Sequence, residues 1–79
     1  MKRMITMKYY QRLRDLREDK ELYQKDIAQV LNTSQKQYSR WESGEYEMPM
    51  HNFIKLAKFY DVSIDYITGL TNNRQRYKD

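Results

Sequence analysis

The sequence predicts an all-α fold, and two features of the chain support that prediction. Apolar residues recur at intervals of three and four, as on the face of an amphipathic helix, and not at the intervals of two that mark a strand. The 79 residues include only two glycines and one proline, which leaves few positions for hairpin turns. This length suits one small domain with a single core.

The first two helices are predicted over 9–20 and 24–31, where apolar residues are spaced to form a stripe between charged ones. The residues expected on these stripes are Tyr9, Leu13 and Leu16 in the first helix, and Ile27, Ala28, Val30 and Leu31 in the second. Because the two stretches lie close together in the sequence, we expect a short link between the helices.

A tight turn and a third helix are predicted next. Asn32 suits the left-handed backbone that ends a helix. Ser34, followed three residues later by Gln37, has the spacing of a capping box that opens a helix. Gly44 is the residue type that most often stops one. The third helix is therefore predicted over 35–43.

Two further helices complete the prediction. The segment 50–60 repeats the helical period, and Ser63 is placed to cap a short last helix over 64–68, which Gly69 closes. A polar tail over 71–79 is expected to fray. The apolar residues of the fourth helix are Phe53, Ile54, Leu56, Ala57 and Tyr60.

The basic excess of the chain lies at its two ends. The net charge is +4, yet 15–70 holds seven basic residues against ten acidic ones. Net charge alone therefore does not identify nucleic acid as a partner. The basic extension over 1–8 leaves two interpretations open: either Lys2, Arg3 and Lys8 contact DNA, or residues 1–6 are a disordered extension without function.

Composition excludes several classes of function. The absence of cysteine excludes a disulfide framework, a thiolate zinc site and a cysteine nucleophile. No apolar run is long enough for a membrane span or a signal-peptide core, so we expect a cytoplasmic protein with no membrane partner. His51 is the only histidine, and no catalytic or phosphate-loop motif accompanies it. We expect no enzyme activity, cofactor, metal or small-molecule ligand.

The predicted third helix carries different side chains on opposite faces. Tyr38 and Trp41 share an apolar face, which we expect to join the core. The residues of the opposite face are Gln35, Lys36, Ser39 and Arg40. Their amide, ammonium, hydroxyl and guanidinium groups suit the base edges in the major groove of DNA. A polar outer face is also ordinary for a surface helix, so its composition alone leaves both interpretations open.

The order and spacing of five short motifs along the chain resemble those of a known family. The motifs that carry this resemblance are RLRDLRED (12–19), QKDIA (24–28), NTS (32–34), YSRWESG (38–44) and VSIDYI (62–67). Together they resemble the helix-turn-helix DNA-binding domains of the phage repressor and Cro type, also called the XRE family. The resemblance covers 9–70 and implies a compact five-helix bundle of the lambda-repressor-like type.

This resemblance implies roles for particular residues. The helix over 35–43 would lie in the major groove. The implied base readers are Gln35, Lys36, Ser39 and Arg40, and the implied phosphate contacts are Gln24, Ser34 and Tyr46. Arg17 and Glu42 match the family's structural ion pair between the first helix and the end of the third.

We therefore expect a sequence-specific regulator of transcription that binds double-stranded DNA, and we expect it to repress. One such domain reads a short half-site, so a homodimer on a palindromic operator is expected. The residues placed on the pairing surface are Ile64, Tyr66, Ile67, Leu70 and Tyr77.

A second interpretation stays open because of the loop after the third helix. Glu45 and Glu47 stand there, where the family often has basic residues that face phosphate. Their carboxylates would weaken DNA binding. They favour a protein-binding helix-turn-helix module, either antitoxin-like or a co-regulator, with weak or no DNA binding.

Overall fold

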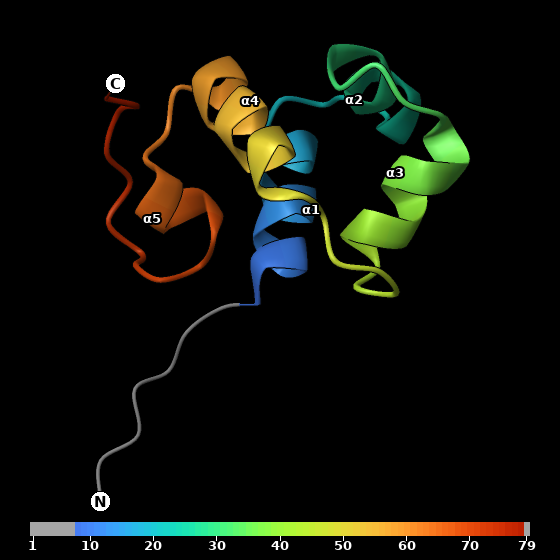
Figure 1. Cartoon of the computed structure of the whole chain (residues 1–79). Helices are drawn as coiled ribbons and strands as arrows, with labels where there is room; N and C mark the ends of the chain where they lie inside the picture. Colours follow the sequence, from blue (N-terminus) through green and yellow to red (C-terminus); the bar gives the residue numbers. More distant parts are fainter. Residues whose placement is uncertain (1–7, 79) are drawn as a thin grey trace, which may run out of the picture.

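The computed structural model describes residues 8–78, and within this range five helices form a compact bundle (Figure 1). They are α1 (Tyr9–Asp19), α2 (Gln24–Val30), α3 (Gln35–Glu42), α4 (Met50–Tyr60) and α5 (Ile64–Ile67). The all-α, five-helix prediction is confirmed, and no helix end differs from its predicted position by more than one residue. Of the basic extension over 1–8, only Lys8 belongs to the described residues, so Lys2 and Arg3 lie outside them.

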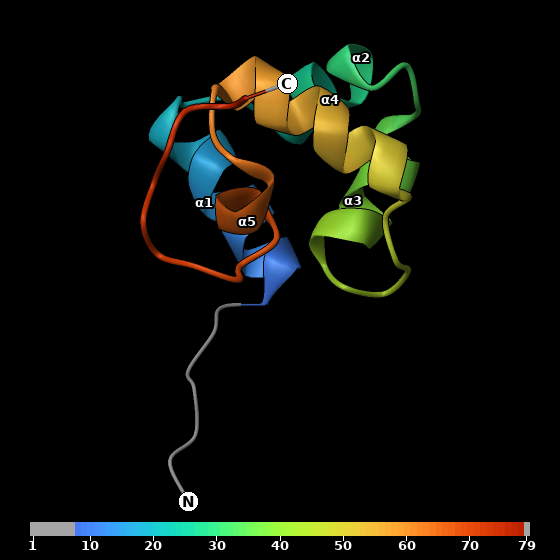
Figure 2. The same cartoon turned by 60° about the vertical axis from the view of Figure 1, so that its left-hand side comes forward.

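The helix α1 is central to the bundle. It packs against both α3 and α5, while α2 packs against α3 and α4 packs against α5. Figure 1 shows α2 and α3 together on one side of α1, and α5 with the C-terminal tail on the other side. In Figure 2, where that other side comes forward, α5 lies in front of α1. The α2–α3 pair therefore lies on the opposite side of α1 from α5.

The side-chain caps predicted for Ser34 and Ser63 are present, although for Ser34 the structure shows only its own half of the predicted capping box. The Oγ of Ser34 accepts a hydrogen bond from the backbone N–H of Gln37 at 3.1 Å, and Ser63 caps α5 in the same way. Asn32 has a φ of 56° after α2, and Gly44 has a φ of 84° after α3. These local interactions hold α3 one tight turn away from α2.

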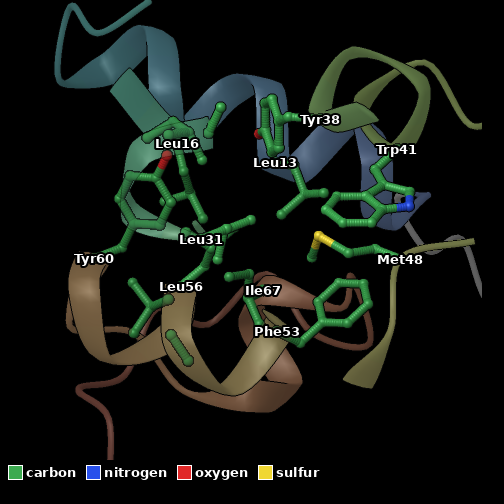
Figure 3. Close-up of a cluster of buried hydrophobic side chains, with 14 residues drawn as sticks. Leu13, Leu16, Leu31, Tyr38, Trp41, Met48, Phe53, Leu56, Tyr60 and Ile67 are labelled. Carbon is green, nitrogen blue, oxygen red and sulfur yellow. The ribbon is translucent and has the colours of Figure 1, made fainter. Parts of the chain in front are cut away.

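The apolar faces of all five helices meet in one core (Figure 3). Its fully buried side chains include Leu13, Leu16, Ile27, Tyr38, Leu56, Val62 and Ile67. Tyr38 and Trp41 are buried as predicted, and they anchor the inner face of α3. Figure 3 also shows the sulfur of Met48 between the rings of Trp41 and Phe53. Met48 comes from the loop after α3, so the loop adds to the core as well.

Two apolar residues of the predicted helical pattern, Val30 and Ile54, lie at the surface and not in the core. Val30 lies at the edge of the α2 stripe, and only the middle of that stripe packs against the core. Ile54 shares the outward face of α4 with Met50 and Lys58, which are spaced four residues to either side and are also exposed. The helical period identifies which residues form an apolar stripe, but the positions of the neighbouring helices decide how much of that stripe is buried.

The tail is held against the domain, whereas the sequence predicts fraying. The backbone N–H of Ser63 donates to the carbonyl of Gln75 at 2.7 Å. The carboxylate of Asp61 accepts hydrogen bonds from Arg76 Nε at 2.7 Å and from the backbone N–H of Tyr77 at 3.2 Å. These bonds join residues 12 to 16 positions apart, and no local pattern in the tail indicates them.

Arg12 joins α1 to the chain that follows α5. Its guanidinium donates to the carbonyls of Tyr66 and Thr71 at 3.0 and 3.3 Å, and to Asn72 Oδ1 at 2.7 Å. It also lies 3.9 Å from the centroid of the Tyr66 ring.

The placement of Ile67 on a pairing surface is wrong, because its side chain is fully buried.

Candidate nucleic-acid interface

The polar face of α3 lies on the outside of the bundle. Gln35 and Lys36 are exposed, and Ser39 and Arg40 are half-buried. These four side chains line one surface hollow together with Gln24 from the start of α2. The structure thus brings the four predicted base readers together, beside a residue predicted to contact phosphate. We call this hollow the reader hollow.

The tight turn sets how α2 presents α3. The backbone N–H of Thr33 donates to the carbonyl of Ala28 at 2.9 Å, which ties the turn to the last part of α2. Ala28 is itself buried, and its small side chain allows α2 to pack closely on α3. The outer face of α3 is consequently held in one orientation relative to the core.

An ion pair beneath this face connects α1 to α3. Arg17 donates from Nε and Nη2 to the two carboxylate oxygens of Glu42, each at 2.9 Å. Its Nη1 donates to the carbonyl of Leu22 at 2.8 Å. The Glu42 side chain is 4% exposed and the Arg17 side chain 14%. The two charges therefore neutralise each other inside the protein and are not available to bind a ligand.

Gln24 belongs to the same network. Its Nε2 donates to Glu42 Oε1 at 3.0 Å. The amide nitrogen carries two N–H groups, so the second one can donate toward the surface. Because Glu42 holds the amide in place, Gln24 reaches the reader hollow in a defined orientation.

The pair also predicts how stability depends on pH. Burial by itself raises the pKa of Glu42, but hydrogen bonds from Arg17 and Gln24 outweigh it and hold that pKa below the ordinary value of 4.5. A carboxyl with a lowered folded-state pKa contributes stability above its unfolded pKa and loses it as the pH falls. We expect the free energy of unfolding to drop as the pH falls below about 4.5, and to drop less in Glu42→Gln. Urea unfolding between pH 3 and pH 6 measures this difference, and parallel curves for both proteins would contradict it.

Tyr46 lies in the loop after α3 with its side chain against Arg40. The centroid of its ring is 5.5 Å from the guanidinium carbon of Arg40, within the range of a cation–π contact. The backbone N–H groups of Glu45 and Tyr46 both donate to the carbonyl of Arg40, at 3.0 and 3.3 Å. The loop therefore folds back on the end of α3, and the Tyr46 ring restricts where the Arg40 side chain can point.

The acidic residues of this loop are exposed. Glu45 and Glu47 both have accessible side chains, on either side of the half-exposed Tyr46. The loop that follows α3 thus carries negative charge at the surface, and such charge opposes an approaching phosphate.

A second hollow adjoins the reader hollow, and the two share Gln24 and Ser39. Its lining residues are Tyr10, Gln11, Arg14, Gln24, Ser39, Glu42 and Ser43. We call it the α1 hollow, because α1 contributes Tyr10, Gln11 and Arg14 to it and contributes no residue to the reader hollow. No local sequence pattern indicates that Gln11 and Arg14 lie near α3, since their closeness to it depends on how α1 packs.

The described part of the chain holds neither a candidate metal site nor a candidate membrane span. Residues 8–78 contain no group of three or more side chains able to hold a metal ion. No helix in that range is long and apolar enough to cross a membrane. His51 is exposed in the first turn of α4.

Comparisons with known proteins agree with this arrangement. A family model described as "Helix-turn-helix" matches residues 13–67, a range that includes α2, α3 and the turn between them. The HTH-type transcriptional regulator YobD of Bacillus subtilis is 37% identical over 65 residues, which cover 82% of this chain and 58% of that protein. The HTH-type transcriptional activator BcrR of Enterococcus faecalis is 36% identical over 59 residues, which cover 75% of this chain and 29% of that protein. This chain therefore spans less than two thirds of the length of either relative.

A solved structure shares the fold. The crystal structure of a transcriptional regulator from Listeria innocua matches 89% of this chain and 64% of its own chain, with a TM-score of 0.77. The two sequences are 24% identical, so this likeness speaks for the fold alone.

Proposed function

The chain belongs to the helix-turn-helix family, and from that membership we propose that it is a sequence-specific regulator of transcription that binds double-stranded DNA. The observation that carries the proposal is the reader hollow, where four side chains able to pair with base edges gather on the exposed face of α3. In helix-turn-helix proteins the second helix of the pair enters the major groove. Here that helix is α3.

Each reader has a chemical preference. Lys36 and Arg40 donate to O6 and N7 of guanine, and Gln35 pairs with adenine through its amide. Ser39, the fourth reader, donates or accepts at either kind of base edge. The contact with Tyr46 supports Arg40 in this role, because an oriented guanidinium loses less conformational freedom when it binds.

Phosphate contacts position α3 without reading sequence. Gln24 contributes the N–H group that Glu42 does not use. Ser34 accepts the hydrogen bond that caps α3, and its hydroxyl proton donates to a phosphate. The hydroxyl of Tyr46 is the third predicted contact, on the half-exposed ring beside Arg40.

Two copies of the chain bind one operator in this proposal. A single α3 covers a short half-site, and proteins of this type reach specific affinity by pairing on palindromes with half-sites about 34 Å apart. Of the residues predicted to pair, Leu70 offers an apolar side chain that is 65% exposed. We further propose that the homodimer acts in the cytoplasm as a repressor. One relative is named as an activator. A reporter gene placed downstream of the operator therefore tests whether this chain represses or activates transcription.

The protein-binding alternative has one observation in its favour. Glu45 and Glu47 are exposed beside the surface where phosphates would lie. A module of this kind uses the same helix pair to hold a protein partner, antitoxin-like or as a co-regulator, and binds DNA weakly or not at all.

Selection of binding sites from random duplexes tests the main proposal with the full chain. The expected result is one enriched motif with palindromic symmetry and half-sites spaced by a helical turn. The selected sequence also identifies the bases that α3 reads. Failure to enrich any sequence would favour the protein-binding alternative.

Salt dependence separates the two functions in a second way. Each phosphate neutralised by a Lys or Arg side chain adds about −0.9 to the slope of log affinity against log salt. Lys36 and Arg40 are the basic side chains of the reader hollow. With one of them in each copy neutralising a phosphate beside the groove, we expect a slope of about −2 or steeper on the selected duplex. Fluorescence anisotropy across a range of salt concentrations measures it. A flat dependence on the same duplex would contradict the proposal.

A further inference from the structure

We propose that the DNA footprint extends from α3 onto α1, and that the α1 hollow binds a backbone phosphate through Arg14. This inference rests on the proposed function and adds a contact that the helix pair alone does not supply. The α1 hollow and the reader hollow share Gln24 and Ser39, so one continuous polar surface runs from α1 to the outer face of α3. A DNA duplex bound to the outer face of α3 therefore also contacts α1.

The charges in the α1 hollow favour an anion. Among the described residues that line it, Arg14 and Glu42 are the charged ones. The carboxylate of Glu42 is almost fully buried and is neutralised by Arg17 and Gln24. The charge that a ligand meets in this hollow is thus the guanidinium of Arg14.

Arg14 is available for a new partner. It approaches Glu18 at 3.8 Å within α1, and both side chains are more than half exposed. Exposed pairs of this kind contribute little to stability, so exchanging the carboxylate for a phosphate costs little. A guanidinium can also hold two phosphate oxygens at once, which an ammonium does not.

Gln11 supplies a second donor next to Arg14. Its Oε1 accepts a hydrogen bond from the backbone N–H of Lys8 at 3.3 Å, so its NH₂ group is turned away from that bond. Ser43 is not used, because its hydroxyl already donates to the carbonyl of Arg40 at 3.1 Å. Arg14 provides the charge, while the amides of Gln11 and Gln24 provide neutral donors to one phosphate between α1 and α2.

The test compares Arg14→Ala with Lys55→Ala on the duplex recovered by selection. Lys55 is exposed on α4 and lies outside both hollows, so this control removes the same charge elsewhere. We expect Arg14→Ala to weaken binding about tenfold per copy near 0.1 M salt and to reduce the salt slope by about 0.9 per copy. The loss should be the same for all sequences, since a phosphate contact carries no base information. Lys55→Ala should change neither quantity.

Several outcomes distinguish this inference from the proposed function. If the unmodified chain binds no duplex, the proposed function itself fails. If it binds, and Arg14→Ala matches Lys55→Ala in affinity and slope, only the α1 contact is wrong. A changed sequence preference in Arg14→Ala would also overturn the inference, because it would make Arg14 a base reader. Thermal unfolding checks that both variants fold, and Arg14→Lys, which keeps the charge, should retain most of the salt slope.

Discussion

Replacing Glu42 with alanine is expected to lower the free energy of unfolding by about 3 to 5 kcal/mol. The change leaves the guanidinium of Arg17 without its carboxylate in a site where it is largely shielded from water. It also removes the acceptor that orients Gln24. Since domains are stable by roughly 0.05 to 0.15 kcal/mol per residue, this loss is a large part of the total for so short a chain. Urea unfolding followed by circular dichroism at pH 7 measures it.

Glu18→Ala is the matched control for this prediction. It removes a carboxylate of the same kind from the exposed side of α1, where the distance to Arg14 is 3.8 Å. We expect a change below about 0.5 kcal/mol, the size typical of exposed pairs within a helix. If Glu42→Ala costs no more than Glu18→Ala, the ion pair does not hold α1 to α3. In that case the outer face of α3 depends on the apolar core alone for its orientation.

Replacing Arg40 with alanine is expected to relax discrimination at one base pair of each half-site by about 1 to 3 kcal/mol. A dimer that reads both half-sites would lose about 2 to 6 kcal/mol of preference for its operator. The reason is that Arg40 lines the reader hollow on the outer face of α3, where its guanidinium carbon lies 5.5 Å from the centroid of the Tyr46 ring. Repeating the site selection with the variant measures the effect as a flattened position in the motif.

The comparison for Arg40 is Arg74→Ala, which removes an arginine from the tail. The Arg74 guanidinium lies 5.8 Å from the centroid of the Tyr66 ring and takes no part in either hollow. Its removal should leave the motif unchanged. If Arg40→Ala returns the original motif while binding to every sequence weakens equally, Arg40 contacts the backbone and its assignment as a base reader is wrong.

Much of the architecture was predictable because it depends on neighbouring residues. The turn between α2 and α3 follows from Asn32 in a left-handed conformation and from Ser34 capping the N–H of Gln37. The two faces of α3 follow from helical period, which places Tyr38 and Trp41 opposite the polar readers. These interactions span four residues or fewer, so a single sequence contains all the information they need.

Glycine is needed at position 44 for two reasons, one set by the local backbone and one set by packing against a distant residue. The sequence indicates a helix stop there, and the φ of 84° agrees with it. The structure adds a second requirement, because a Cβ at this position would come within 2.7 Å of the Tyr10 ring on α1. Only the packing of α1 beside the end of α3 creates that requirement.

By itself the sequence determined five helices, the caps formed by Ser34 and Ser63, and the outward polar face of α3, since period and capping act within one or two turns. Tertiary structure alone decided that Arg12 holds the tail, that Gln24 donates to Glu42, and that Arg14 stands beside the reader hollow. The physical reason is distance along the chain. Contacts between residues 18 to 60 positions apart exist only once the helices have packed, and their packing depends on the shape of the whole core.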